Sequence, residues 1–176
     1  MGSHLLVDET KAKGYVVVVL ACPDEALAVA RKEIRRLILP GQRSVHMKQE
    51  GDRRRRQIID VVVGLADQDV SATIVRVDGG GREGLLRERA LREVVAIARE
   101  SPDAQLVLDL DPGQLVRDRR VLSRAIAASG ATASFRHAAL AAEELLTLPD
   151  VVAWCWSRGH VWRRRILPII DSVRWA

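Results

Sequence analysis

The sequence predicts an α/β protein in which helices cover a mixed β-sheet. Two short apolar segments at residues 5–9 and 15–21 stand close enough together to form a leading hairpin. After them, further short apolar segments alternate with longer segments whose apolar residues repeat at helical spacing. A hairpin followed by alternating strands and helices is typical of a mixed sheet and excludes a helical bundle or a β-sandwich.

The strands are predicted from short apolar runs bounded by Gly, Pro, Asp or Ser. They are residues 5–9, 15–21, 71–77, 105–110 and, with a weaker pattern, 133–137. The segment 44–49 is a further candidate for a short strand. The order of elements is therefore two strands followed by alternating helices and strands, within a single domain spanning residues 1–176.

The helices are predicted from apolar residues three and four positions apart, and from the residues that end each run. They are residues 24–39 before Pro40-Gly41, 52–66, 86–98 before Ser101-Pro102, and 115–126 before Gly130. Pro149 suits a first helical position and predicts a helix that begins there. A last helix is expected over residues 161–173.

Composition narrows the class of protein. The chain has 176 residues, of which 48% are hydrophobic and only 3% aromatic, so an aliphatic core is expected. No run of about 18 uncharged apolar residues predicts a membrane span, and no secretory signal is visible at the N-terminus. Two cysteines, Cys22 and Cys155, stand in apolar surroundings away from any zinc-ligand spacing. A cytoplasmic protein with two buried thiols is expected.

Arginine clusters point toward an anionic partner. The net charge is +5, and the excess is concentrated at residues 53–56, 117–120 and 163–165. Such clusters suit nucleic acid, RNA or DNA, but they are equally typical of solvated helix faces. The candidate contacts are Arg53, Arg54, Arg119 and Arg120. The tryptophans at 154, 156, 162 and 175 suit either stacking on bases or packing on an apolar helix.

Two strands end in acidic residues. Side chains alternate along a strand, so Asp8 shares a face with Leu6, while Glu9 points to the other face. On the later strand, Asp109 and Asp111 share a face with Val107. If the two strands are neighbours, Asp8 and one of these two carboxylates project into the same space. Such carboxylates repel one another unless a cation lies between them, and Mg²⁺ prefers oxygen ligands. The alternative is that each acid begins a solvated turn, as Asp-Pro-Gly at 111–113 suggests.

Two further segments carry polar side chains that could take part in binding or catalysis. Asp150 falls in the first turn of an apolar helix, where a carboxylate is also favourable for the helix itself. In "RSVHMKQEGD", the residues His46, Lys48 and Glu50 would share a face if the segment is extended. They could serve as a ligand, a phosphate contact or a proton carrier, or simply be surface residues before a helix.

The acidic motifs resemble a known family. "LLVDET" followed by "YVVVVLA" resembles the Asp-Glu-Ser opening of a large bacterial family of uncharacterised ribonuclease H-like domains. The sequence resembles actinobacterial members of that family. "SVHMKQE", "LVLDLD" and "LPDVVAWCW" resemble its His- and Glu-bearing segment, its acidic fourth strand and its terminal Asp. Thr10 replaces the usual Ser, and the terminal Gln-x-x-Asp pattern lacks its Gln, because Leu146 or Thr147 occupies that region.

The resemblance implies a ribonuclease H-like fold and a nuclease-type site that depends on Mg²⁺ or Mn²⁺. The implied metal ligands are Asp8, Asp109 or Asp111, and Asp150, with Glu50 as a fourth acid. In such sites two ions activate a water and stabilise the leaving oxygen of a phosphodiester. His46 or Lys48 would move a proton or hold the phosphate.

Two other readings of the sequence remain open. One is a ribonuclease H-like module without catalytic activity that binds nucleic acid or a protein partner. The other is a dimerisation domain whose interface is the Trp-bearing C-terminal helix, which would make the protein a homodimer.

Overall fold

A single mixed sheet of six strands forms the centre of the protein. The computed structural model describes residues 2–12 and 14–176. The strands are β1 (Ser3–Thr10), β2 (Tyr15–Pro23), β3 (Ser71–Val77), β4 (Gln105–Asp109), β5 (Ser134–Ala138) and β6 (Ile170–Trp175). Their order across the sheet is β5-β4-β1-β2-β3-β6. The α/β class and the mixed sheet are thus confirmed.

The directions of the strands divide the sheet into two parts. β1, β2 and β3 form an antiparallel meander, whereas β4 pairs in parallel with β1, and β5 in parallel with β4. Leu6 of β1 lies opposite Val107 of β4, so the two strands end at the same edge of the sheet. Because β1 and β4 are neighbours, Asp8 and an acid that follows Val107 can project into the same space.

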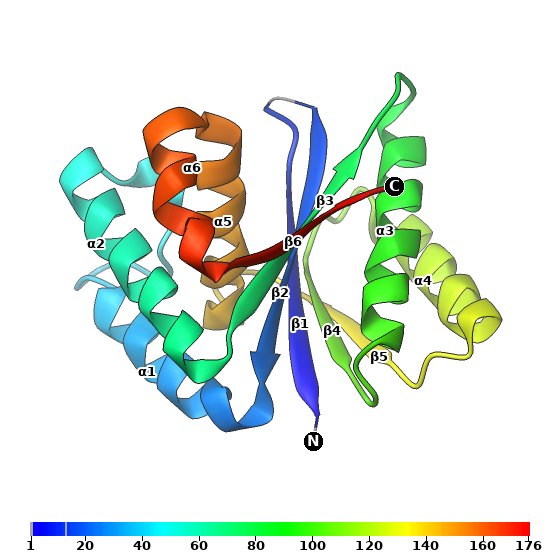
Figure 1. Cartoon of the computed structure of the whole chain (residues 1–176), viewed down its shortest axis with the longest axis horizontal. Coiled ribbons are helices and arrows are strands. Elements are labelled where there is room, and N and C mark those ends of the chain that lie inside the picture. Colours follow the sequence, from blue (N-terminus) through cyan, green and yellow to red (C-terminus); the bar gives the residue numbers. More distant parts are fainter. Residues whose placement is uncertain (1, 13) are drawn as a thin grey trace.

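Helices cover both faces of the sheet (Figure 1). One layer contains α1 (Leu27–Leu37), α2 (Asp52–Gly64), α5 (Thr147–Arg158) and α6 (His160–Ile166). The other contains α3 (Glu83–Arg99) and α4 (Leu115–Ser129), and α4 is followed by the cap residue Gly130, whose φ is 69°. Short 3₁₀ turns at 24–26, 47–49, 65–68, 144–146 and 167–169 connect or extend these elements.

The strand β2 explains why its sequence is apolar at almost every position. Val16, Val18 and Leu20 are buried under α1, α2 and α5, while Val17 and Val19 are buried under α3 and α4. A central strand with helices on both faces has no solvated side, so it shows no alternation of polar and apolar residues. Two apolar cores, one on each side of the sheet, result from this arrangement.

Three predicted elements were wrong. Residues 44–49 do not form a strand, because a 3₁₀ turn occupies Met47–Gln49. The helix α5 begins at Thr147, so Pro149 is its third residue and not its first. The predicted helix 161–173 ends at Ile166, and the chain continues into β6, which pairs in parallel with β3. The Trp-bearing C-terminal segment is therefore partly an edge strand.

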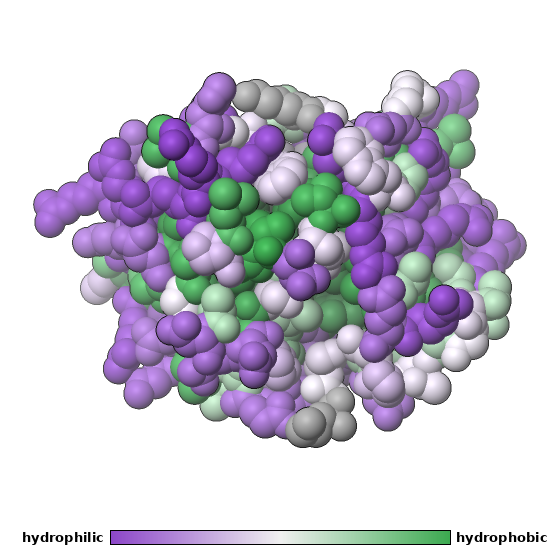
Figure 2. Space-filling model, in the orientation of Figure 1, coloured by the Kyte–Doolittle hydropathy of each residue, from purple (hydrophilic) through white to green (hydrophobic). Residues whose placement is uncertain are grey.

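The surface is hydrophilic on both helical flanks, and apolar side chains gather near the middle of the face on which β6 lies (Figure 2). The exposed large apolar side chains include Leu167 and Val173, in and beside β6. None of the helices formed by residues 2–12 and 14–176 has the length and apolar character that a membrane crossing requires.

Candidate active site

Three carboxylates from three elements lie on the same side of the sheet, at one end of β1 and β4. Leu6 and Val107 both belong to the core beneath α5, and alternation along each strand places Asp8 and Asp109 on that side as well. Asp150 lies in the first turn of α5, the helix that packs on β1 and β2. Asp8 and Asp109 are partly buried, and the side chain of Asp150 is 17% exposed.

The three carboxylates interact electrostatically. Burial, together with the charges of Asp150 and Asp109, raises the pKa of Asp8 well above its usual value. Burial also raises the pKa of Asp109 and of Asp150, and the charge of Asp109 adds to the effect on Asp150. Lys48 acts in the opposite direction on Asp8 and Asp150. Burial is thus the main cause at all three acids, and the charges of neighbouring acids add to it.

Backbone contacts hold two of these acids in place. The N–H of Glu9 donates to Asp8 Oδ1 at 2.7 Å, and the N–H of Met47 donates to Asp150 Oδ2 at 3.2 Å. His46 Nδ1 lies 3.9 Å from the same Asp150 oxygen, and the His46 side chain is 44% exposed. The segment around Met47 thus packs its polar groups against the N-terminus of α5, where a carboxylate also favours the helix.

The segment 46–50 does not present its three polar residues on one face. His46 is extended, but the 3₁₀ turn at 47–49 rotates the chain, so the expected alternation fails. Lys48 stays near the acids, whereas the buried Glu50 carboxylate accepts a hydrogen bond from Gln42 Nε2 at 3.2 Å. His46 and Lys48 therefore lie at the acidic cluster, whereas Glu50 is hydrogen-bonded to Gln42.

Asp111 lies beyond the end of β4 and takes part in a turn. Its Oδ1 accepts the N–H of Gly113 at 2.9 Å, and its backbone carbonyl accepts the N–H of Gln114. This is the ordinary behaviour of an Asp-Pro-Gly sequence. Its charge still reaches Asp109 and helps to raise that pKa. Of the two alternatives on this strand, Asp109 is the one placed on the strand beside Asp8.

The chemistry of these side chains fits a hard divalent cation, because all three offer carboxylate oxygens and their repulsion would be relieved by a positive ion. The three carboxylates are not arranged as the ligands of a formed metal centre. Across residues 2–12 and 14–176, no three His, Cys, Asp or Glu side chains are grouped so that they could hold a metal ion as they stand. Binding would therefore require the carboxylate side chains to turn toward a shared ion.

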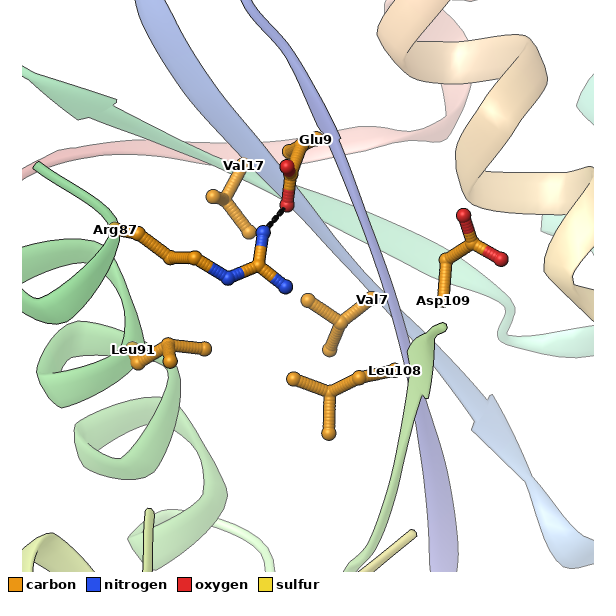
Figure 3. A pocket seen from close by; sticks show the side chains of 7 residues that line it. All are labelled: Val7, Glu9, Val17, Arg87, Leu91, Leu108 and Asp109. Carbon is orange, nitrogen blue, oxygen red and sulfur yellow. Dashed lines mark hydrogen bonds and ion pairs between the residues drawn. The ribbon is translucent and has the colours of Figure 1, made fainter. Parts of the chain in front are cut away.

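Glu9 faces the opposite side of the sheet, as alternation predicts. There its carboxylate pairs with Arg87 of α3, and Arg87 in turn donates from Nε and Nη2 to both oxygens of Asp118 at 2.8 and 2.7 Å. His137 Nε2 lies 3.2 Å from Asp118 Oδ2. Figure 3 shows the ion pair between Arg87 and Glu9 beside the apolar side chains that line the same pocket. The Asp109 carboxylate points away from this pair.

Sequence reasoning missed this buried ionic network. Arg87 and Asp118 are 4% and 0% exposed, and burial alone would raise the pKa of Asp118. The hydrogen bonds from Arg87 and His137 outweigh burial and hold that pKa below its usual value. The adjoining cavity measures about 10 Å³, which is room for no more than a single water. The network therefore ties α3 and α4 to β1 and offers no binding site.

The predicted nucleic-acid contacts are spread over both helical layers. Arg53 is exposed on α2, while Arg54 is half-buried and donates to the carbonyl of Leu37 at the end of α1. Arg119 and Arg120 are exposed on α4, on the far side of the sheet. Arg55, from the same run as Arg53, donates from Nε to the Met47 carbonyl at 3.0 Å and so supports the segment beside the acids.

The cysteines take no part in the acidic cluster. Both are buried free thiols, as expected. Burial raises the pKa of Cys22 to about 11 and that of Cys155 to about 12, so neither is a thiolate near neutral pH.

Comparison of the chain with protein-family models, with curated proteins and with solved structures found no match.

Proposed function

We propose that the protein is a divalent-metal-dependent nuclease with a ribonuclease H-like fold, acting on the phosphodiester bonds of RNA or DNA. The observation that carries the proposal is the convergence of Asp8, Asp109 and Asp150, from β1, β4 and α5, on one side of the sheet. Carboxylates from separate elements do not gather in a half-buried place for stability, because Asp109 and Asp150 raise the pKa of Asp8 there and Asp109 raises the pKa of Asp150.

The fold supports this proposal in a specific way. An antiparallel meander leads into a strand parallel to β1, and acids stand at the end of the first strand, of the fourth strand and on a late helix. This is the order of acids for which the sequence resembles ribonuclease H-like domains. Fold alone does not establish function, so the site residues carry the functional part.

Each side chain of the cluster has a proposed task. Asp8, Asp109 and Asp150 are the proposed ligands of Mg²⁺ or Mn²⁺, which when bound would supply an activated water and charge stabilisation. Lys48 would hold the substrate phosphate, and its charge already acts on both Asp8 and Asp150. The half-exposed His46, 3.9 Å from Asp150, would move a proton.

The substitution of Asp109 tests the proposal, with Asp111 as its matched control. We expect Asp109→Asn to lower Mg²⁺- or Mn²⁺-dependent cleavage at least about 100-fold, because a lost ligand removes several kcal/mol of stabilisation. Asp111→Asn removes the same charge two residues away and should keep most of the activity, because Asp111 belongs to a turn. The assay measures cleavage of labelled RNA, DNA and RNA–DNA hybrids with each metal.

Two outcomes would contradict this assignment. Equal loss of cleavage in the two variants would show that cleavage depends on negative charge near the end of β4. It would not support ligation of the metal by Asp109. A wild-type protein that cuts none of these substrates, and binds neither metal in a calorimetric titration, would exclude the nuclease.

A second candidate function is a nucleic-acid-binding module without catalytic activity. It is favoured by the absence, among the described residues, of three groups arranged to hold a metal. It predicts salt-sensitive binding through exposed arginines such as Arg53 and Arg119, with no loss on substitution of Asp8. Binding measured with and without divalent ions separates it from the nuclease.

A further inference from the structure

A second cleft lies farther along the same side of the sheet. It measures about 70 Å³ and has a polar lining from three strands (β1, β2 and β3) and from α5 and α6. Its lining residues are Thr10, Val16, Arg76, Trp156, Ser157 and Arg163. None of these residues belongs to the acidic cluster, and the cleft is large enough for a group bigger than one water.

The cleft adjoins the acidic cluster through β1 and α5. Thr10 follows Asp8 by two residues and therefore points to the same side of β1, about 7 Å farther along. The strand register places Thr10 opposite Val16, and Val16 opposite Arg76. Ser157 lies seven residues after Asp150 on α5, about 10 Å along the helix. The offset along β1 is comparable to the spacing of neighbouring phosphates on one nucleic-acid strand, whereas the offset along α5 is longer.

The charge in this cleft is positive and uncompensated. Within the described chain, neither Arg76 nor Arg163 forms an ion pair with a carboxylate, although most other buried or half-buried arginines on the sheet and helices do. No acidic side chain lines the cleft. Two guanidinium groups facing the same small space repel each other, and an anion placed between them would remove that repulsion.

Aromatic stacking holds both guanidinium groups in position. Arg76 lies over the Trp175 ring at 4.2 Å, and Arg163 lies over the Trp156 ring at 4.3 Å. Arg163 also donates from Nε and Nη2 to the Trp156 carbonyl at 3.2 and 2.8 Å, which leaves Nη1 free for another acceptor. A stacked guanidinium has lost most of its freedom before binding, so less entropy is lost when a phosphate is bound.

We propose that this cleft binds a backbone phosphate of a nucleic-acid strand whose neighbouring phosphate lies at the acidic cluster. Arg76 and Arg163 supply the charge, and the Thr10 hydroxyl supplies a further donor. This inference rests on the proposed function, because it identifies the substrate as a polynucleotide and not a mononucleotide. The cleft has room for a phosphate group.

The test measures binding of a fluorescein-labelled oligothymidylate by anisotropy, in EDTA, so that no metal ion or cleavage is involved. We expect Arg76→Gln and Arg163→Gln each to weaken binding about tenfold and to lower the slope of log affinity against log salt by about 0.7. Arg164→Gln is the matched control, because Arg164 is exposed on α6 beside Arg163 and does not line the cleft. It should change binding by less than about twofold.

Several results would overturn the inference. One is an equal loss of affinity in Arg164→Gln and Arg163→Gln, which would indicate a diffuse charge effect. Another is unchanged binding in Arg76→Gln, a variant that leaves the contacts of Arg163 with Trp156 intact. Full competition by inorganic phosphate at the affinity of the oligonucleotide would assign the cleft to free phosphate. If the cleft variants lose binding while the wild type cleaves none of the substrates with either metal, the phosphate site stands and the nuclease assignment fails.

Discussion

Replacement of Asp8 by Asn is expected to make the metal-free protein more stable near neutral pH. Burial and the charges of Asp150 and Asp109 raise the pKa of Asp8, so its charged form is unfavourable in the folded protein. The amide keeps an oxygen that can accept the N–H of Glu9 and removes the charge. Single stabilising substitutions commonly add about 0.5–2 kcal/mol, and a gain of this size is expected here. Urea denaturation in EDTA measures the gain.

The gain in stability should depend on pH with a definite sign. An acid whose folded pKa is raised destabilises the protein once the pH exceeds its value of 3.8 in the unfolded chain, and the penalty is complete above the folded pKa. The advantage of Asp8→Asn over the wild type should therefore shrink as the pH falls toward 4. Asp171→Asn, on the exposed part of β6, controls for the general effect of losing an acid.

Divalent metal should reverse the ranking of the two proteins. If Asp8 is a ligand, Mn²⁺ at 100 times its dissociation constant stabilises the wild type by about 2.7 kcal/mol, and the Asn variant gains much less. A variant that is less stable than the wild type in EDTA at pH 7.5 would mean that Asp8 supports the fold. Equal stabilisation of both proteins by Mn²⁺ would remove Asp8 from the proposed metal site.

The central strands and most of the helices could be predicted because local sequence and final environment agree. Residues 71–77 form β3 at the predicted bounds, and the apolar face of Ala30, Ile34 and Leu37 is buried in α1 as its spacing indicates. The side assigned to Asp8 and Glu9 by alternation is the side each occupies. Alternation depends only on the geometry of a strand, so one sequence suffices to predict it.

The strand β6 could not be predicted from spacing alone. The residues Ile166, Ile169, Ile170 and Val173 follow a helical repeat, although only Ile166 lies in an α-helix and Ile169 lies in the 3₁₀ turn at 167–169. The available signal was Pro168, which does not suit a helix interior and stands where the chain leaves α6 for β6. Pairing with β3 decides the outcome, and that partner is almost a hundred residues away in the chain.

The candidate site was predictable in its acids and not in its surroundings. Periodicity indicates the face of Asp8 and Asp109, but the turn at Met47 that separates Lys48 from Glu50 depends on tertiary contacts. The buried network had one visible signal, because Arg87 stands among Ala90, Leu91 and Val94 on the apolar face of a helix. A charge in such a position requires a buried partner, and only the fold reveals that this partner is Asp118.

The largest loss of stability is expected from Arg87→Met. The side chain of Arg87 is buried and donates two hydrogen bonds to Asp118, which has no exposed surface. Methionine fills a similar volume but leaves the Asp118 carboxylate with His137 as its remaining side-chain partner. Removing one member of a buried ion pair costs about 3–5 kcal/mol. Urea denaturation at pH 7.5 should show a loss of this size, whereas Arg92→Met, at an exposed position of the same helix, should cost little.

A second substitution separates the cost of the unpaired charge from the cost of the altered packing. In the wild type the pKa of Asp118 is lowered, so its contribution to stability is present above pH 3.8 and is lost as the pH falls through the folded pKa. Without Arg87, burial dominates and favours the protonated acid, so the deficit of Arg87→Met should shrink between pH 7.5 and pH 5. Adding Asp118→Leu should recover most of the loss, because a well-packed apolar pair often replaces a buried ion pair without cost. A deficit that stays constant with pH, and persists in the double variant, would assign the loss to packing of the arginine stem between α3 and β1.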